Sequence, residues 1–201
     1  MRSIARNTLF GAVVVWFTLS AQQPTCNKCS ATYITSDEVQ AYLKRAADNN
    51  LTDQQVRAVS IGKSNIGIGV VYRGKLTAPV NDSVAEHDLV SEVYHVIDGS
   101  ATLVTGPDIL DEKRRPADLQ TVREFNGPGN SGSSVRNGVT YQLKAGDVIV
   151  IPGGTGHWFT KIDDHIRYLM VRIEPDKVLP MKDEAASQAY LRSPATNGKN
   201  K

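Results

Sequence analysis

The chain of 201 residues is long enough for one ordinary domain with a substantial hydrophobic core. Hydrophobic residues make up 40% and charged residues 22% of it, which excludes a disordered chain. The 23 Lys and Arg residues nearly balance the 21 Asp and Glu residues, and no basic cluster supplies the face that a nucleic-acid partner needs. The composition therefore predicts a folded domain with no nucleic-acid partner.

Residues 1–21 have the pattern of an export signal peptide. Arg2 and Arg6 form a positive start, an apolar run of about a dozen residues follows, and small residues stand at Ser20 and Ala21. The run is shorter than the ~20 apolar residues that cross a bilayer. We therefore predict cleavage after Ala21, or one residue earlier, and a periplasmic or secreted protein without a stable membrane span. An uncleaved membrane anchor is the alternative interpretation.

Cys26 and Cys29 are the only cysteines of the chain. In an oxidising compartment they are expected to pair with each other. A thioredoxin-like site needs a surrounding βαβ pattern and a zinc ribbon needs a second cysteine pair, and the sequence has neither. We expect a local disulfide or two free thiols here.

A short helix is predicted within the N-terminal segment, residues 22–55. Thr35 can cap the first backbone amides while Glu38, three residues later, reaches back, as in a capping box. The apolar residues that follow recur at steps of three and four and form one stripe of a helix: Val39, Tyr42, Leu43 and Ala46.

Residues 56–180 have a different pattern, made of short runs rich in Val, Ile and Tyr. Dipeptides typical of tight turns separate several of them: Asp98-Gly99, Asn137-Gly138 and Gly153-Gly154. The strand candidates are residues 57–61, 66–72, 91–97, 101–104, 139–143, 147–151, 157–161 and 166–173. Short strands at this spacing without interleaved helices predict a closed or sandwiched antiparallel β structure.

The segment 107–136 interrupts these strands with a stretch rich in Pro, Gly, Asn, Ser and charged residues. A connection this long inside a compact domain is usually functional or disordered. It can fold over the mouth of the β structure as a lid whose arginines hold an anionic substrate, but we favour an ordinary solvated loop. The arginines concerned are Arg114, Arg115, Arg123 and Arg136. Residues 181–201 are expected to form a short helix from Asp183 to Leu191 and a loose tail.

Two stretches of the chain contain the residues with metal-ligand chemistry. His87 is followed at the fifth residue by Glu92, and the segment from Gly146 to His157 places a strand and a Pro-Gly turn before its histidine. These stretches resemble the two signature motifs of the cupin superfamily, the first with a His-x-His pair before its Glu and the second with one His. His87 takes the place of the second histidine of the first motif, and Ala85 stands where the first is usual.

The resemblance covers roughly residues 60–175 and implies a fold and a metal. The fold is a mainly all-β cupin jelly-roll, a double-stranded β-helix barrel, with a short N-terminal helix. The cofactor is one divalent transition metal ion (Fe, Mn, Zn or Ni) held by His87, Glu92 and His157. With Ala85 in place of a histidine, this is the ligand set of the facial triad of non-haem Fe(II) oxygenases and equally of catalytic zinc sites. An empty pocket is the alternative.

The periodicity of a strand decides which other side chains share the predicted centre. His87 and Glu92 are an odd number of residues apart, so a bulge or turn must lie between them if both face inward. Tyr94 shares the inward face with Glu92, so we predict it as the catalytic acid-base group, with packing as the alternative. His95 and Glu86 are expected to face away from the ligands, and a histidine in the polar stretch at residues 163–165 is expected in solvent.

These observations lead to two interpretations of function. The first is an exported metal-binding cupin that acts as a metalloenzyme on a small organic substrate. The second is a non-catalytic cupin that binds a small molecule such as a sugar, with a degraded or empty metal site. Ala85 favours the second, as does Lys161, which stands where the second motif usually has Asn. The resemblance also implies that two copies can pair as a homodimer, as cupin barrels often do.

Overall fold

The computed structural model describes residues 24–26, 29–49 and 51–194, so the predicted export signal lies outside the described residues. The elements in chain order are α1 (Ser36–Asn49), β1 (Asp53–Ser60), β2 (Asn65–Leu76), β3 (Val84–Ala85), β4 (Ser91–Gly106), β5 (Ile109–Leu110), β6 (Lys113–Arg114), η1 (Val122–Asn126), β7 (Asn130–Gly132), β8 (Ser134–Val135), β9 (Val139–Lys144), β10 (Val148–Ile151), β11 (Gly156–Glu174) and α2 (Glu184–Arg192). None of the helices in the described ranges is long and apolar enough to cross a membrane.

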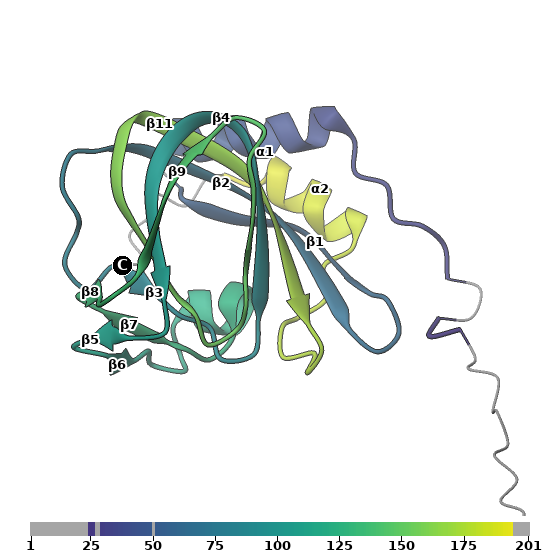
Figure 1. Ribbon diagram of the computed structural model, residues 1–201. Coiled ribbons are helices and arrows are strands. Elements are labelled where there is room, and N and C mark those ends of the chain that lie inside the picture. Colours follow the sequence, from purple (N-terminus) through teal and green to yellow (C-terminus); the bar gives the residue numbers. More distant parts are fainter. Residues whose placement is uncertain (1–23, 27–28, 50, 195–201) are drawn as a thin grey trace, which may run out of the picture.

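In the part of the chain that the structure describes, nine strands form one antiparallel sheet that curves into a barrel (Figure 1). The long strands β4 and β11 pair with each other along most of their length. Each takes different partners in its two halves: β4 pairs with β10 and then β9, while β11 pairs with β3 and then β2. The predicted mainly β jelly-roll with a short N-terminal helix is confirmed.

The tight turn predicted at Asp98-Gly99 is wrong, because β4 continues through it as one strand. The candidates at residues 157–161 and 166–173 likewise belong to the single strand β11, which has a register shift between them. Gly99 has φ 78°, and a Cβ atom there would lie 2.1 Å from the carbonyl oxygen of His165. Glycine at this position therefore permits a sharp bend and a close crossing inside a continuous strand.

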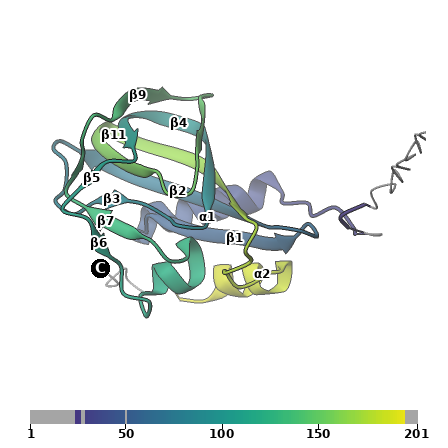
Figure 2. The same ribbon diagram turned by 60° about the horizontal axis from the view of Figure 1, so that its bottom comes forward.

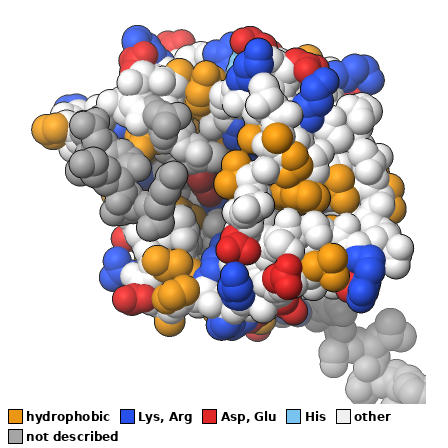
Figure 3. Space-filling model, turned by 90° about the vertical axis from the view of Figure 1, so that its left-hand side faces the viewer, with side chains coloured by type: hydrophobic (Ala, Val, Ile, Leu, Met, Phe, Trp, Pro, Cys, Tyr) orange, Lys and Arg blue, Asp and Glu red, His pale blue; other side chains and the backbone are white. Residues whose placement is uncertain are grey.

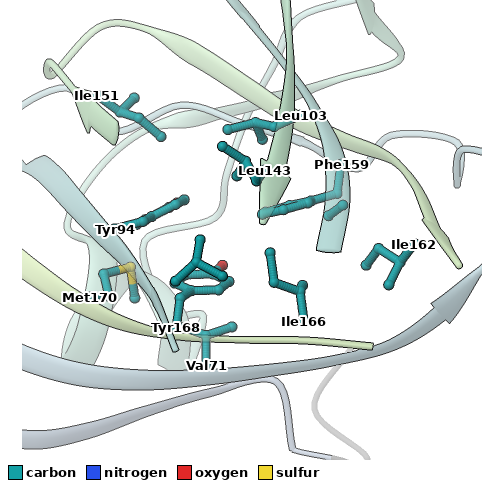
Figure 4. Packing of buried hydrophobic residues seen from close by; sticks show 12 residues of the cluster. Val71, Tyr94, Leu103, Leu143, Ile151, Phe159, Ile162, Ile166, Tyr168 and Met170 are labelled. Atoms are coloured by element: carbon teal, nitrogen blue, oxygen red, sulfur yellow. The ribbon is translucent and has the colours of Figure 1, made fainter. Parts of the chain in front are cut away.

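The interior of the barrel is filled by inward-facing apolar side chains of β2, β4, β9, β10 and β11 (Figure 4). Within this cluster the rings of Tyr94 and Tyr168 pack together with their centroids 4.4 Å apart. Phe159 packs on the other side of Tyr168 at 6.0 Å. The aromatic cluster fills one part of the barrel and leaves the metal-ligand candidates beside it.

The two helices lie outside the barrel, beside β1 and β2 (Figures 1 and 2). Helix α1 forms over the predicted residues, and the hydroxyl group of Thr35 accepts a 3.1 Å hydrogen bond from the amide of Glu38. The side chain of Glu38 does not complete the capping box. It instead forms two hydrogen bonds with Arg57 of β1, at 2.8 and 3.0 Å, and both side chains are buried. A buried ion pair therefore joins α1 to the sheet.

Both terminal segments contain features predicted from the sequence. Helix α2 has Asp183 as its N-cap, whose carboxylate accepts a 2.8 Å hydrogen bond from the amide of Ala186. Cys26 and Cys29 are joined as a disulfide, which is one of the two predicted alternatives.

The segment 107–136 consists of short paired strands and the helical turn η1. β6 pairs with β7 and β7 with β3, while β5 pairs with β8 in a small separate sheet. Figure 1 shows these strands gathered at one end of the barrel. Main-chain pairing therefore fixes this segment to the barrel beside β3.

Candidate metal centre

The three predicted ligands come together from separate segments of the barrel. Glu92 lies in β4, His157 lies at the start of β11, and His87 lies in the connection between β3 and β4. His157 is paired with Ala85 of β3, and the amide of Gly154 donates a 2.8 Å hydrogen bond to the carbonyl oxygen of His87. The turn before β11 is therefore fixed to the His87 connection by main-chain contacts.

An irregularity between His87 and Glu92 allows both side chains to face inward. The chain bends at residues 88–89, where it belongs to no strand. The hydroxyl group of Ser91 then accepts a 3.0 Å hydrogen bond from the amide of Gly153, which fixes the start of β4. The bulge or turn expected in this interval is confirmed, and it interrupts the alternation of side chains between the two faces.

The carboxylate of Glu92 lies between the two imidazoles. Its Oε1 is 3.5 Å from Nε2 of His87, and its Oε2 is 3.5 Å from Nε2 of His157. One ligand atom from each of the three residues lies within 4.8 Å of the others, and all three side chains are buried. Two imidazoles and one carboxylate form a donor set that suits a divalent transition metal ion.

The hydrogen bonds of the two histidines differ in how well they suit a metal. Nδ1 of His157 lies 3.2 Å from the carbonyl oxygen of Thr155, which can only accept, so this nitrogen carries the proton. Nε2 of His157 is then free to bind a metal, with a backbone carbonyl orienting the ring. Nδ1 of His87 instead lies 3.1 Å from a guanidinium nitrogen of Arg115, which can only donate. His87 therefore binds a metal through Nε2 only when its proton moves to Nδ1 and Arg115 shifts.

The charges of the centre suit a metal ligand set at neutral pH. Burial lowers the pKa of His87 to about 3 and also lowers the pKa of His157, so both imidazoles are neutral. Burial alone raises the pKa of Glu92, but the histidines in their protonated form, Arg172 and the Tyr94 hydroxyl group outweigh it, so this pKa lies below its ordinary value and the carboxylate is ionised at neutral pH. Because the histidines are neutral, Arg172 is the permanent positive charge that faces the carboxylate.

Arg172 was not predicted from the sequence. It pairs in register with Glu92 across β4 and β11, and its Nε lies 3.6 Å from Oε1 of Glu92. It is fully buried and also donates hydrogen bonds to Gln55, at 2.6 Å, and to Asp53. The signal in the sequence is its inward position on β11, two residues after the buried Met170. A charged residue at a strand position that faces the core needs a buried partner.

Tyr94 lies beside the centre, as predicted. Its hydroxyl group donates a 2.7 Å hydrogen bond to Oε2 of Glu92, and burial followed by the Glu92 charge raises its pKa well above the ordinary value. The phenol therefore stays protonated and orients the carboxylate. Its predicted role as the acid-base group remains a prediction.

The remaining predicted side chains lie outside the centre. Glu86 is buried but accepts two 3.0 Å hydrogen bonds from Asn130, and His95 is exposed on the outer face of β4, as expected for both. His165 differs from the prediction of simple solvation. It is partly buried, and its ring nitrogens contact Asp98 at 3.1 Å and Asp164 at 2.6 Å. The bend of β4 and the register shift of β11 bring these groups together.

Comparison with known proteins gives similarities among solved structures only. No family model and no curated protein sequence matches the chain. A protein from Bacillus halodurans is 13% identical, with 81% of this chain and 98% of that chain covered and a TM-score of 0.43. A cupin 2 conserved barrel domain protein from Salinispora arenicola is 16% identical, with 80% and 97% covered and a TM-score of 0.38. The DMSP lyase DddQ from Ruegeria pomeroyi is 15% identical, with 64% and 49% covered and a TM-score of 0.39.

The barrel of shared long strands and the meeting of the residues from both motifs are features that the cupin resemblance implies. The chain has the cupin fold. Within this cupin barrel, Ala85, which stands where the motif usually has a histidine, lies at a pocket. This pocket has a volume of about 180 Å³ and is also lined by His157. Structural similarity at 13–16% sequence identity identifies no activity, so the function depends on the residues of the centre itself.

Proposed function

We propose that this chain is an exported metal-binding cupin that acts as a metalloenzyme on a small organic molecule. The observation that carries the proposal is the meeting of His87, Glu92 and His157 around one point in the barrel. A bound divalent ion supplies a Lewis acid there, with coordination positions left open by a set of only three protein ligands. The identity of the ion, among Fe, Mn, Zn and Ni, is left to measurement.

The surrounding residues give the centre a definite protein contribution. Arg172 and Tyr94 hold the Glu92 carboxylate ionised and oriented, while the carbonyl oxygen of Thr155 fixes the ring of His157. The pocket beside Ala85 and His157 gives a small molecule access to the same place. The aromatic cluster of the core excludes water from the other side of the centre.

Metal analysis of the purified mature chain tests this proposal. We expect about one divalent ion per chain in the wild type and a content at least about tenfold lower in His157→Ala, because a ligand is lost. His95→Ala is the matched control, since this histidine is exposed on the outer face of β4, and it should keep the wild-type content. Metal-free wild-type protein that stays metal-free in the presence of Zn²⁺, Fe²⁺, Mn²⁺ and Ni²⁺ would contradict the proposal.

The alternative function is a non-catalytic cupin that binds a small molecule in a degraded or empty site. The contact between Arg115 and Nδ1 of His87 favours it, because a guanidinium donor opposes the proton position that metal binding needs. The metal analysis also separates the two functions, since a carrier with an empty site retains no ion in any variant.

Export is proposed from the pattern of residues 1–21. The expected mature N-terminus is Gln22, or Ala21 if cleavage occurs one residue earlier. N-terminal sequencing of protein recovered from the periplasm or medium of the expressing cells tests this. An intact Met1 on membrane-bound protein would instead support the uncleaved anchor.

A further inference from the structure

The pocket beside the metal centre opens between the end of β2, the connection to β3 and the start of β11. Its wall includes Ala85, His157, Arg73 and Phe159. At about 180 Å³ it is smaller than the 300–1,000 Å³ typical of drug-sized ligands. It therefore suits a molecule of only a few carbon atoms.

Ala85 forms part of the wall of this pocket on the side of β3. It pairs in register with His157, so its side chain stands beside a metal-ligand candidate on the neighbouring strand. A histidine here would fill the gap with an imidazole, whereas the methyl group of alanine leaves it open. Ala85 therefore occupies less of this pocket than the imidazole usual in the motif would.

Two basic residues line this pocket, Arg73 and the exposed Lys75, and Arg73 is the one bonded to a residue of the core. Its Nε donates a 3.3 Å hydrogen bond to the hydroxyl group of Tyr168, and its guanidinium carbon lies 4.6 Å from the ring centroid of Phe159. These contacts fix the guanidinium plane and occupy only one of its five N–H groups. Within the described ranges no carboxylate forms an ion pair with Arg73. Asp53 acts on it electrostatically, but Asp53 is itself bonded to Arg172.

We propose that this pocket binds the carboxylate group of a small organic acid, with Arg73 as its anchor. The proposal rests on the proposed function, because it names the class of molecule that reaches the centre. The free N–H groups of a guanidinium match the two oxygens of a carboxylate and hold it bidentately. Since Arg73 and His157 both line the pocket, an acid held by Arg73 has the rest of the molecule near the metal-ligand candidates.

The surrounding surface does not supply this selectivity by its general charge. Figure 3 shows the side of the molecule on which the β2–β3 connection lies, and acidic side chains are interspersed there with Lys and Arg. A ligand is therefore attracted by a specific group rather than by a uniformly positive face. Arg73 is a group of this kind within the pocket.

Binding of propionate and of its neutral isostere propionamide to the full mature chain tests the proposal, with saturation-transfer NMR to measure the dissociation constants. We expect the wild type to bind propionate at least about tenfold more tightly than propionamide. Arg73→Gln should abolish this preference, and Arg73→Lys should retain part of it because the charge remains. Ala85→His should weaken both ligands by filling the pocket while leaving Arg73 in place.

Lys144→Gln is the charge control, since this exposed lysine of β9 does not line the pocket, and it should bind as the wild type does. A preference for propionate that persists in Arg73→Gln would overturn the proposal, as would wild-type binding in Ala85→His. Thermal unfolding of each variant confirms that it is folded.

Metal analysis of the same samples separates this proposal from the proposed function. An Arg73-dependent preference in a chain that holds no metal supports the carboxylate pocket and contradicts the metalloenzyme. Metal binding without any preference for propionate supports the metal centre of the proposed function and contradicts the carboxylate pocket.

Discussion

Glu92 is the residue on which the centre depends most, because both oxygens of its carboxylate have defined partners: Oε1 faces His87 and Arg172, and Oε2 faces His157 and Tyr94. Tyr94 donates to Oε2 at 2.7 Å, and its ring also packs against Tyr168. Tyr94→Phe removes only the hydroxyl group, so we expect the fold to persist and metal affinity to fall by about 10- to 100-fold. Competition with a chromogenic chelator measures this change.

Tyr141→Phe is the control for this substitution. Tyr141 lies on β9 with 38% of its surface exposed, so loss of its hydroxyl group should leave metal affinity unchanged. Equal affinity of Tyr94→Phe and the wild type would show that the hydrogen bond does not orient the ligand.

Arg115 limits the other side of the centre, because its guanidinium faces Nδ1 of His87. Removal of this donor in Arg115→Ala leaves His87 free to carry its proton on Nδ1 and to bind a metal through Nε2. We expect metal affinity to rise by about tenfold, the scale of one charge-assisted hydrogen bond. The neighbouring Arg114→Ala should have no such effect, since Arg114 is exposed and bonded to Asp88. A lower affinity in Arg115→Ala would refute this account of His87.

The ligands of the centre could be predicted from the sequence, whereas their partners could not. Motif spacing specifies His87, Glu92 and His157, because strands joined by a turn bring residues at these fixed spacings to the same place in the barrel. Arg115 reaches His87 from 28 residues away and Arg172 reaches Glu92 through a register between two distant strands. Such contacts depend on strand pairing, which local spacing does not specify.

At the level of elements, α1 is attached to the sheet by a charge pair that is almost fully buried. Glu38→Ala leaves the guanidinium of Arg57 buried without its partner, and we expect the free energy of unfolding to fall by about 3–5 kcal/mol. Arg57→Met in the same background should restore most of this loss, because it removes the unpaired charge. Urea unfolding of both single variants and the double variant measures the coupling.

Lys44→Ala is the control for this cycle, since it removes an ion pair with Asp48 on the exposed face of the same helix. We expect it to change the free energy of unfolding by about 0.5 kcal/mol or less. A similarly small effect of Glu38→Ala would mean that water reaches the Arg57 site.

The elements themselves were predicted unequally well. Helix α1 has a cap and an apolar stripe, both local signals, and its bounds follow them closely. The two longest strands were each divided in the prediction, because Asp98-Gly99 and the polar residues 163–165 have the composition of turns. Pairing of β4 with β11 overrides that composition, since the main-chain ladder continues on both sides of the bend.

For the whole molecule, Lys182 makes stability depend on pH in the alkaline range. Burial, followed by the charge of Arg57, lowers its pKa from 10.5 to about 8, although it donates a 3.1 Å hydrogen bond to Tyr42. Between these values the unfolded chain holds a proton that the folded chain has released, so stability rises with pH. Relative to Lys182→Met, the wild type should therefore gain free energy of unfolding from pH 8 to pH 10.

Chemical denaturation at each pH measures this difference. Lys144→Met, at an exposed lysine of β9, serves as the control for general alkaline effects. A difference between the wild type and Lys182→Met that is constant over this range, or that shrinks, would contradict the shifted lysine.

The sharing of β4 and β11 between both halves of the barrel has a mechanical consequence. A sandwich of two separate sheets has a seam along which the layers can part, but here two continuous strands cross from one half to the other. Entry to the interior must therefore depend on the connections at one rim, not on breathing of the wall. Amide hydrogen exchange should accordingly be slowest along these two strands and fastest in the rim, whatever molecule passes through it.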